Sequence, residues 1–152
     1  MVKVQIADFD VGQVLADMRQ HNPQIGAIVS FVGLVRDMND QQSVSTLTLE
    51  HYPAMTEKAL QAIVDQAQQR WDIMDAVVIH RVGTLQPLDQ IVLVAITSAH
   101  RQAAFSACEF VMDYLKTQAP FWKKETNSEG ERWVEAKDSD TQAQARWQST
   151  RQ

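Results

Sequence analysis

Residues 26–35 form an almost unbroken apolar run, and a run of this kind leaves few choices of fold. The segment Gly26-Ala-Ile-Val-Ser-Phe-Val-Gly-Leu-Val35 is rich in β-branched residues, which is typical of a strand covered on both faces. Residues 76–80 and 91–96 show the same pattern. The sequence therefore predicts a sheet of buried strands, with residues 26–35 as its central strand.

Strand and helix patterns alternate along the rest of the chain. Apolar residues recur at helical spacing in three segments, which cover residues 11–18, 55–71 and 98–118, with Ser98 as the expected cap of the last one. Residues 2–6 and 44–51 have strand character, residues 36–43 are polar and loop-like, and residues 121–125 and 132–136 flank a turn as the arms of a hairpin do. Interleaved elements of this kind predict an α/β or α+β fold with a mixed sheet.

The length of the chain favours a single domain. A chain of 152 residues buries enough surface for one core, and its one cysteine, Cys108, excludes an internal disulfide framework. No linker or repeat divides it. We expect one domain over residues 1–137 and a loosely attached tail over residues 138–152, which is rich in Gln.

The charge balance excludes some classes of partner. Fourteen Lys and Arg face nineteen Asp and Glu, which gives a formal charge of −5 and argues against general binding of a nucleic-acid backbone. No apolar stretch is long enough to cross a bilayer, and no signal-like run opens the chain. We therefore expect a cytoplasmic protein that binds neither nucleic acid nor membrane, with any basic site confined to a local cluster.

Two local basic clusters lie where α/β proteins bind anions. Arg36 directly follows the apolar run, at the end of a predicted strand. His100 and Arg101 lie in the first turn of a predicted helix, where free N–H groups and the helix dipole favour an anion. A solvated loop arginine and an ordinary exposed helix start are the alternatives.

From Tyr114 to Lys124 the chain has three lysines and no acid, next to aromatic residues. Lys116 is placed in the last turn of the long helix, where it also complements the dipole. Lys123 and Lys124 are neighbours on a predicted strand, so their amines point to opposite faces. This concentration of amines is a candidate anion pocket with nucleophilic or base chemistry.

Other reactive side chains have simpler explanations. Cys108 falls on the apolar stripe of the long helix, which favours core packing. His51 and His80 end or interrupt apolar strands and are interpreted as structural. No set of His, Cys, Asp and Glu has metal-ligand spacing, and no phosphate loop, nucleophile elbow or dinucleotide motif is present.

Helix length separates the two candidate anion sites. Arg101 and Lys116 are fifteen residues apart, or about 22 Å along a continuous helix. One small ligand cannot bridge this distance within a chain. If both ends serve one site, a second subunit supplies one of them, which predicts a symmetric dimer with composite sites.

Seven sequence blocks together resemble one enzyme family. They are Phe31-Val-Gly-Leu-Val-Arg36, Leu49-Glu-His-Tyr-Pro53 with Met55-Thr-Glu-Lys58, Ile79-His-Arg-Val-Gly83, Thr97-Ser-Ala-His-Arg101, Met112-Asp-Tyr-Leu-Lys116, Ala119-Pro-Phe-Trp-Lys-Lys-Glu125 and Arg132-Trp-Val-Glu-Ala136. The blocks resemble the large, catalytic subunit of molybdopterin synthase over about residues 26–137. The resemblance implies an α/β hammerhead fold of α+β type, with flanking helices and a small antiparallel subdomain.

The resemblance also implies a reaction and partners. The expected enzyme is a sulfurtransferase that inserts two dithiolene sulfurs into cyclic pyranopterin monophosphate during molybdenum cofactor biosynthesis. The sulfur comes from the C-terminal thiocarboxylate of a small ubiquitin-like subunit, so no cofactor or metal is expected and Cys108 is dispensable. Two large subunits form a homodimer, which becomes a heterotetramer with one small subunit at each end.

The site residues follow from the resemblance position by position. The implied catalytic residues are Lys116 and Lys123. The implied substrate contacts are these two lysines together with Leu34, Val35, Arg36, His100, Arg101, Lys124, Glu125 and Lys137. The implied pocket for the partner's tail consists of Phe31, Arg36, Met112, Lys116 and Lys123.

A binding module is the alternative from a different class of function. A scaffold that grips the tail of a ubiquitin-like protein without chemistry would also use an extended strand and basic residues. The joint presence of both lysines, Arg36 and the His100-Arg101 pair favours the enzyme, because tail binding alone does not require all of them.

Overall fold

The chain builds two sheets, with helices on both sides of the larger one. The computed structural model describes residues 1–36, 38–39, 42–43, 46–127, 130–134 and 138–149. The larger sheet has the order β1 (Val2–Gln5), β6 (Asp75–Arg81), β8 (Gln90–Ser98) and β2 (Ala27–Leu34). β1 runs parallel to β6, and the other neighbours are antiparallel. The predicted mixed sheet is therefore confirmed, and the fold is α+β.

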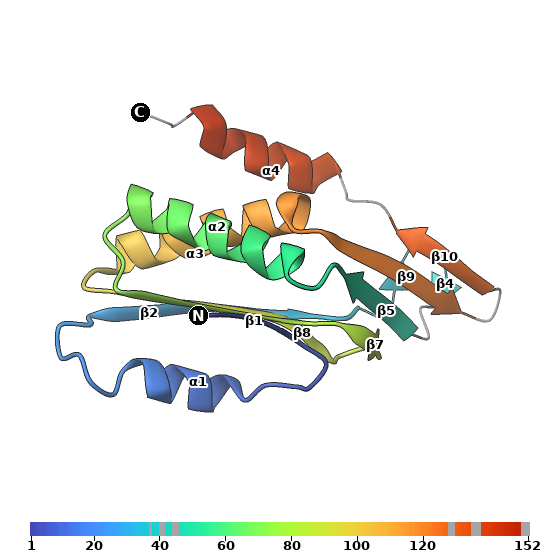
Figure 1. The fold of residues 1–152 in the computed structure, drawn as a ribbon, viewed down its shortest axis with the longest axis horizontal. Helices are drawn as coiled ribbons and strands as arrows, with labels where there is room; N and C mark the ends of the chain where they lie inside the picture. Colours follow the sequence, from blue (N-terminus) through green and yellow to red (C-terminus); the bar gives the residue numbers. More distant parts are fainter. Residues whose placement is uncertain (37, 40–41, 44–45, 128–129, 135–137, 150–152) are drawn as a thin grey trace.

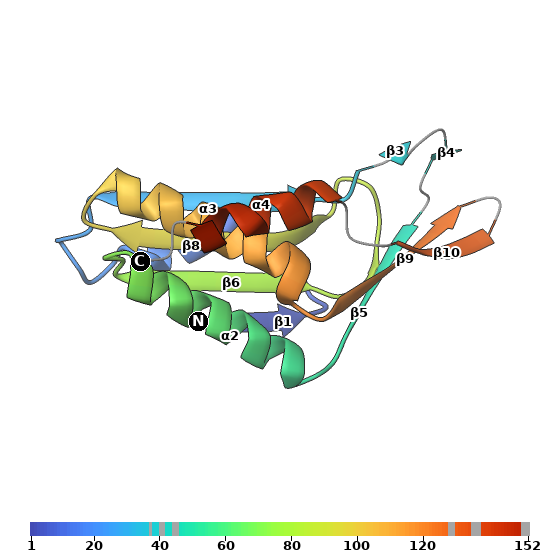
Figure 2. The same cartoon turned by 90° about the horizontal axis from the view of Figure 1, so that it is seen from above.

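The described helices lie in layers about this sheet (Figure 1). α1 (Val11–Met18) covers one face, and α2 (Met55–Arg70) and α3 (Arg101–Gln118) cover the other. The Asp10 carboxylate caps α1 by accepting the Gln13 N–H at 3.0 Å. α4 (Asp138–Ser149) lies on α3, as the view from above shows (Figure 2).

The strands β6 and β8 supply the centre of the core on both faces. Side chains of alternate residues in these strands pack under α2 and α3, and these are Ala76, Val78, Val92, Val94 and Ile96. The intervening residues pack toward α1, and these are Val77, Ile79, Leu93 and Ala95. Because both faces are covered, these strands read as continuous apolar runs rather than alternating ones.

The second sheet extends from the end of the molecule where the first sheet finishes. Its order is β10 (Gly130–Val134), β9 (Phe121–Asn127), β5 (Thr46–His51) and β7 (Gly83–Leu85), and all neighbours are antiparallel. This sheet is the small antiparallel subdomain that the family resemblance implies. β3 (Met38–Asn39) and β4 (Gln42–Ser43) pair within the stretch predicted to be a loop.

The prediction of a central strand at residues 26–35 was wrong. β2 is an edge strand of the larger sheet, beside β8 alone among the described strands. Ser30, Phe31 and Leu34 are exposed on it. The apolar run was interpreted as a strand covered on both faces, but here β6 and β8 occupy the covered positions.

The start of the long helix also differs from the prediction. Ser98 belongs to β8, where it pairs with Ala27, and α3 begins only at Arg101. The Ser98 hydroxyl donates to the Asp72 carbonyl at 2.9 Å and accepts the His100 N–H at 3.3 Å. Ser98 therefore secures the turn into the helix instead of capping its first turn.

The C-terminal stretch that the sequence suggested was loosely attached contains α4. The Trp147 ring meets those of Trp71 and Phe110 edge-on, with centroids 5.5 and 5.6 Å apart. Its indole N–H donates to the Asp113 carboxylate at 2.6 Å. The Arg146 guanidinium contacts Glu109 and Asp113 at 2.6 and 2.9 Å. These contacts attach α4 to α2 and α3.

Candidate active site

Lys116 and Lys123 lie on either side of the turn that joins α3 to β9. Lys116 is exposed in the last turn of α3, and Lys123 is half-buried near the start of β9. The turn between them is tight, because the Phe121 N–H donates to the Ala119 carbonyl at 2.9 Å. Both ammonium groups act electrostatically on one imidazole, that of His80. The structure thus brings together the two lysines expected to be catalytic.

His80 occupies a buried position at the end of β6. Its ring stacks on that of Phe121, with centroids 3.8 Å apart and planes inclined by 19°. Nδ1 lies 2.8 Å from the Arg81 carbonyl oxygen. Since a carbonyl oxygen can only accept, Nδ1 carries the proton and Nε2 is the acceptor.

The imidazole of His80 stays neutral at this position. Burial is the main cause that lowers the pKa of His80 to about 3, and it outweighs the raising effect of the Arg81 carbonyl. Electrostatic repulsion by Lys116, Lys123 and His51 lowers the pKa of His80 as well. His80 therefore adds no positive charge next to the lysine turn near neutral pH.

Lys124 and Glu125 point to different faces of β9. The Lys124 ammonium lies 3.5 Å from the Glu131 carboxylate and 5.6 Å from the centre of the Trp133 ring. Glu125 is buried and shares the strand face of Lys123, as alternate residues do. The prediction that Lys123 and Lys124 diverge is confirmed, so Lys124 lies on the face of β9 opposite Lys123.

The end of β2 brings Arg36 to the same end of the molecule. Val35 is buried and donates its N–H to the Asp89 carbonyl at 3.0 Å, while its own carbonyl accepts the Leu88 N–H at 2.8 Å. Val35 packs in a cluster with Leu47, Leu49, Val82 and Leu85, and Phe121 packs against that cluster. Arg36 follows directly and is exposed. Arg36 therefore follows a cluster against which Phe121, from the turn between the two lysines, also packs.

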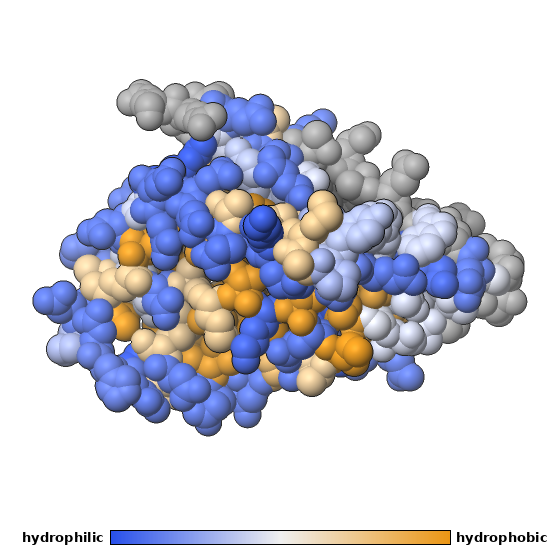
Figure 3. All heavy atoms as spheres, viewed as in Figure 1, coloured by the Kyte–Doolittle hydropathy of each residue, from blue (hydrophilic) through white to orange (hydrophobic). Residues whose placement is uncertain are grey.

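The remaining residues of the expected tail pocket differ in their exposure. Met112 is buried one helical turn before Lys116. Phe31 and Leu34 are exposed on the edge strand. Figure 3 shows one face of the molecule, which is mainly hydrophilic with apolar side chains exposed among the polar ones.

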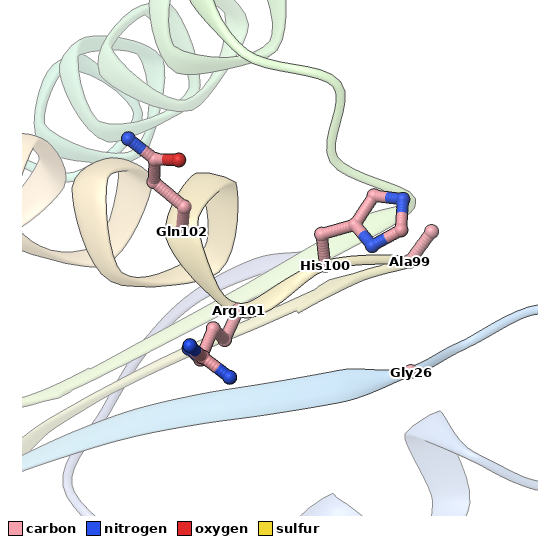
Figure 4. Close-up of a pocket in the computed structure, with 5 residues that line it drawn as sticks. All are labelled: Gly26, Ala99, His100, Arg101 and Gln102. Carbon is pink, nitrogen blue, oxygen red and sulfur yellow. The ribbon is translucent and has the colours of Figure 1, made fainter.

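His100 and Arg101 line an open hollow of about 440 Å³ at the opposite end of α3. Gly26, Ala99 and Gln102 complete its lining (Figure 4). A side chain at Gly26 would collide with the Ala99 carbonyl oxygen, so only glycine lets β2 approach this turn. Arg101 and Gln102 leave the first turn of α3 on different sides. The N–H groups of that turn suit an anion.

One uninterrupted helix separates this hollow from the lysine pair. α3 runs from Arg101 to Gln118 without a break, so the predicted separation of about 22 Å holds within one chain. Lys137, the remaining expected substrate contact, lies outside the described residues.

Cys108 is a poor candidate for sulfur chemistry. It is buried in the core between α3 and the larger sheet, with Sγ 3.9 Å from the Val94 carbonyl oxygen. Burial raises the pKa of its thiol to about 11, and the Glu109 carboxylate adds to this shift. A thiol with that pKa is almost entirely protonated near neutral pH.

The described residues show neither a cluster of metal ligands nor a helix that could span a membrane. Within the described part of the chain, no three His, Cys, Asp or Glu side chains gather as metal ligands. No described helix is both long and apolar enough to cross a membrane.

His80 and Thr56 are the neighbours of the lysine turn that sequence reasoning did not connect to the site. His80 was interpreted as structural, and Thr56 is an unremarkable residue of a predicted helix. Both residues lie in sequence blocks that carry the family resemblance, Met55-Thr-Glu-Lys58 and Ile79-His-Arg-Val-Gly83, but neither block shows that its residue contacts the lysine turn.

Comparison with known proteins identifies the family. A family model described as MoaE protein matches residues 4–118. The chain is 62% identical to the molybdopterin synthase catalytic subunit of Ralstonia nicotianae over 146 residues, which cover 96% of this chain and 83% of that protein.

Solved structures agree with this match. The MoaE protein of Burkholderia ambifaria superposes with a TM-score of 0.84 at 54% identity and covers 97% of each chain. Molybdopterin synthase from Staphylococcus aureus has a TM-score of 0.81 at 32% identity, over 87% of this chain and 95% of that one. The family match, the identity over nearly the whole chain and the shared fold agree with the resemblance seen in the sequence blocks. The chain therefore belongs to the MoaE family, the catalytic subunits of molybdopterin synthase, and is an enzyme of molybdenum cofactor biosynthesis.

Proposed function

We propose that this subunit transfers two sulfur atoms to cyclic pyranopterin monophosphate, taking each from the C-terminal thiocarboxylate of a small ubiquitin-like subunit. The observation that carries the proposal is the position of Lys116 and Lys123 on either side of the tight turn from α3 to β9, whose Phe121 ring stacks on the buried His80. The two amines form a compact positive site for an anionic tail and an anionic substrate. In each transfer the tail's sulfur forms the new C–S bond with a side-chain carbon of the pterin while a C–O bond of that carbon breaks, and the oxygen leaves as water or stays on the phosphate. Water then cleaves the acyl–sulfur bond and leaves the tail as a carboxylate.

The two lysines have complementary places in this scheme. Lys116 is exposed at the mouth of the site, where an incoming tail first meets the protein. There it stabilises the negative charge of the sulfur-addition intermediate or moves a proton at that step. Lys123 is half-buried and sits on the strand face of Phe121 and Glu125, so it holds the substrate's anionic group in a drier environment. Arg36, exposed after β2, and Met112, one helical turn before Lys116 on α3, are the residues that we assign to the binding of the partner's tail.

The hollow at the start of α3 supplies the second anion contact. His100, Arg101 and the free N–H groups of the first turn suit the substrate's phosphate. Since about 22 Å separates Arg101 from Lys116 along α3, we assign these contacts to the partner copy in a homodimer. One small subunit per composite site then gives a heterotetramer. Lys124, Glu125, Leu34, Val35 and Lys137 remain substrate contacts in this proposal.

A turnover assay with purified components tests the proposal. The protein is combined with thiocarboxylated small subunit and cyclic pyranopterin monophosphate, and the dithiolene product is detected as its fluorescent oxidised derivative. We expect product from the wild type and a loss of at least about a hundredfold for Lys116→Ala, the scale for removing one electrostatic contact from a transition state. Binding of the small subunit should persist.

Lys3→Ala is the matched control. Lys3 is an exposed strand lysine on β1, and its removal should leave turnover unchanged. No product from the wild type, with the small subunit bound, would contradict the proposed reaction. Loss of small-subunit binding in Lys116→Ala would make Lys116 a docking residue instead.

A further inference from the structure

The turn between the two lysines is held from two sides by residues that carry no charge. Thr56 in the first turn of α2 is fully buried, and its hydroxyl donates to the Pro120 carbonyl at 3.1 Å. The His80 ring stacks on Phe121, the next residue. Pro120 and Phe121 lie between Lys116 and Lys123 in the chain. These two contacts therefore fix the segment that sets how the lysines face each other.

Helix capping alone does not explain the contact that Thr56 makes. Its hydroxyl accepts the Tyr52 N–H at 3.1 Å, and its own N–H donates to the Tyr52 carbonyl at 2.9 Å. Those bonds already order the entry to α2, and the Glu57 carboxylate holds the Ala54 N–H at 2.6 Å. The donation to Pro120 is an additional bond, which joins residues 64 positions apart.

Core packing alone does not explain His80 either. A leucine or phenylalanine would fill a buried position without the cost of a polar ring. The ring lies nearly flat on Phe121, and its Nδ1–H is anchored on the Arg81 carbonyl. That anchor fixes the orientation of the imidazole, and the stacked Phe121 ring is held in turn. Phe121 is the first residue of β9, so the contact that holds its ring also fixes the position at which the strand begins.

The geometry points to Thr56 and His80 as positioning residues that clamp the Pro120–Phe121 turn and so set the spacing of Lys116 and Lys123 for sulfur transfer. The inference rests on the proposed function, in which both amines act on the same reacting group. A displacement of about 1 Å at reacting groups can cost about a hundredfold in rate. A clamp on the turn therefore affects turnover although neither residue touches the substrate.

Kinetics of paired variants test the clamp. Thr56→Val keeps the shape of the side chain and removes the bond to Pro120, whereas Thr56→Ser keeps the hydroxyl. His80→Leu removes the stacked ring, whereas His80→Phe keeps a ring on Phe121. We expect kcat to fall about tenfold or more in Thr56→Val and His80→Leu with KM for the pterin nearly unchanged. Thr56→Ser and His80→Phe should recover most of the loss.

Thr97→Val is the control for general destabilisation. Thr97 is equally buried, and its hydroxyl donates to the Asp75 carbonyl at 3.5 Å, at the other end of α3 from the lysines. This variant should lose stability without the loss in kcat. A kcat in Thr56→Val equal to that of the wild type would overturn the clamp, and so would an equal loss in Thr97→Val.

A spectroscopic measurement tests the clamp without turnover. Spin labels at Lys116→Cys and Lys123→Cys, in a Cys108→Ala background, report their separation through dipolar broadening. Thr56→Val and His80→Leu should each change this broadening, whereas Thr56→Ser should preserve it. Unchanged broadening in both disruptive variants would overturn the clamp. An inactive wild type with the expected spectral changes would contradict the sulfur-transfer function alone.

Discussion

Burial of His80 makes the free energy of unfolding depend on pH, because it lowers the pKa of the imidazole in the folded protein. Its pKa is about 3 in the folded protein and 6.5 in a free side chain, so between these values the unfolded chain binds the proton and the folded chain does not. Stability therefore falls as pH drops below 6.5 and is fully restored above it. The contribution amounts to a few kcal/mol across this window.

The His80→Phe variant tests this dependence. We expect its free energy of unfolding, measured by urea denaturation between pH 7 and pH 4, to fall less steeply than that of the wild type. His21 is an exposed residue, so His21→Asn should keep the wild-type slope. Equal slopes in the wild type and His80→Phe would mean that His80 is not the buried neutral group seen here.

At the residue scale, the charged residues of the candidate site have a local signal in the sequence, and the neutral residues of the proposed clamp have none. Lys116, Lys123 and Arg36 stand out because local groups of positive charge are unusual in a chain with a net negative charge. Thr56 and His80 act through a carbonyl and a ring that belong to distant parts of the chain. No local pattern encodes such contacts, because they exist only once α2, β6 and β9 have assembled.

At the element scale, strand type was predictable and strand position was not. The runs at residues 26–35, 76–80 and 91–96 are all strands, but the run predicted to be central lies at the edge. Apolar runs of similar composition do not reveal their order in a sheet, since that order depends on which strands pair. The edge position matters for function, because it leaves Phe31 and Leu34 exposed beside Arg36.

The attachment of α4 depends mainly on Trp147. Its ring packs on Trp71 and Phe110 and its indole N–H is bonded to Asp113. We expect Trp147→Ala to lower the free energy of unfolding by about 2 kcal/mol, less than for a fully buried aromatic because the side chain is half-exposed. Trp133 is an exposed tryptophan on β10, and Trp133→Ala is the matched control.

Urea denaturation of both tryptophan variants measures the difference. Arg146→Ala should lose less than Trp147→Ala, because the Arg146 guanidinium is exposed to solvent. Equal stabilities of Trp147→Ala and Trp133→Ala would show that α4 does not contribute to the stability of the fold. The sequence pattern predicted only a loosely attached tail here, because its one anchoring aromatic is isolated among polar residues.

At the scale of the whole molecule, the length of α3 connects the fold to the number of subunits. An unbroken helix from Arg101 to Gln118 keeps the hollow and the lysine pair at opposite ends of one chain. Both parts could be predicted from the sequence, since basic residues at the two ends of a long helix are visible in it. The sequence does not show which copy of the chain supplies Arg101 and which supplies Lys116, because that depends on how two chains pack against each other.

Subunit mixing tests the composite site directly. Arg101→Ala and Lys116→Ala homodimers should each be nearly inactive. After the two variants exchange subunits, half of the dimers contain one of each, and each such dimer has one site with both side chains intact. The mixture should therefore recover about a quarter of the wild-type turnover.

The double variant Arg101→Ala/Lys116→Ala, mixed with wild-type chains, provides the matched control. If each site draws Arg101 and Lys116 from different chains, every mixed dimer is inactive and turnover falls to about a quarter. If each site lies within one chain, the wild-type chain in a mixed dimer keeps its site and turnover falls only to about half. A mixture of the single variants that regains nothing would place both side chains of a site on one chain. In that case the substrate must reach Arg101 and Lys116 in separate events, because α3 keeps them at its two ends.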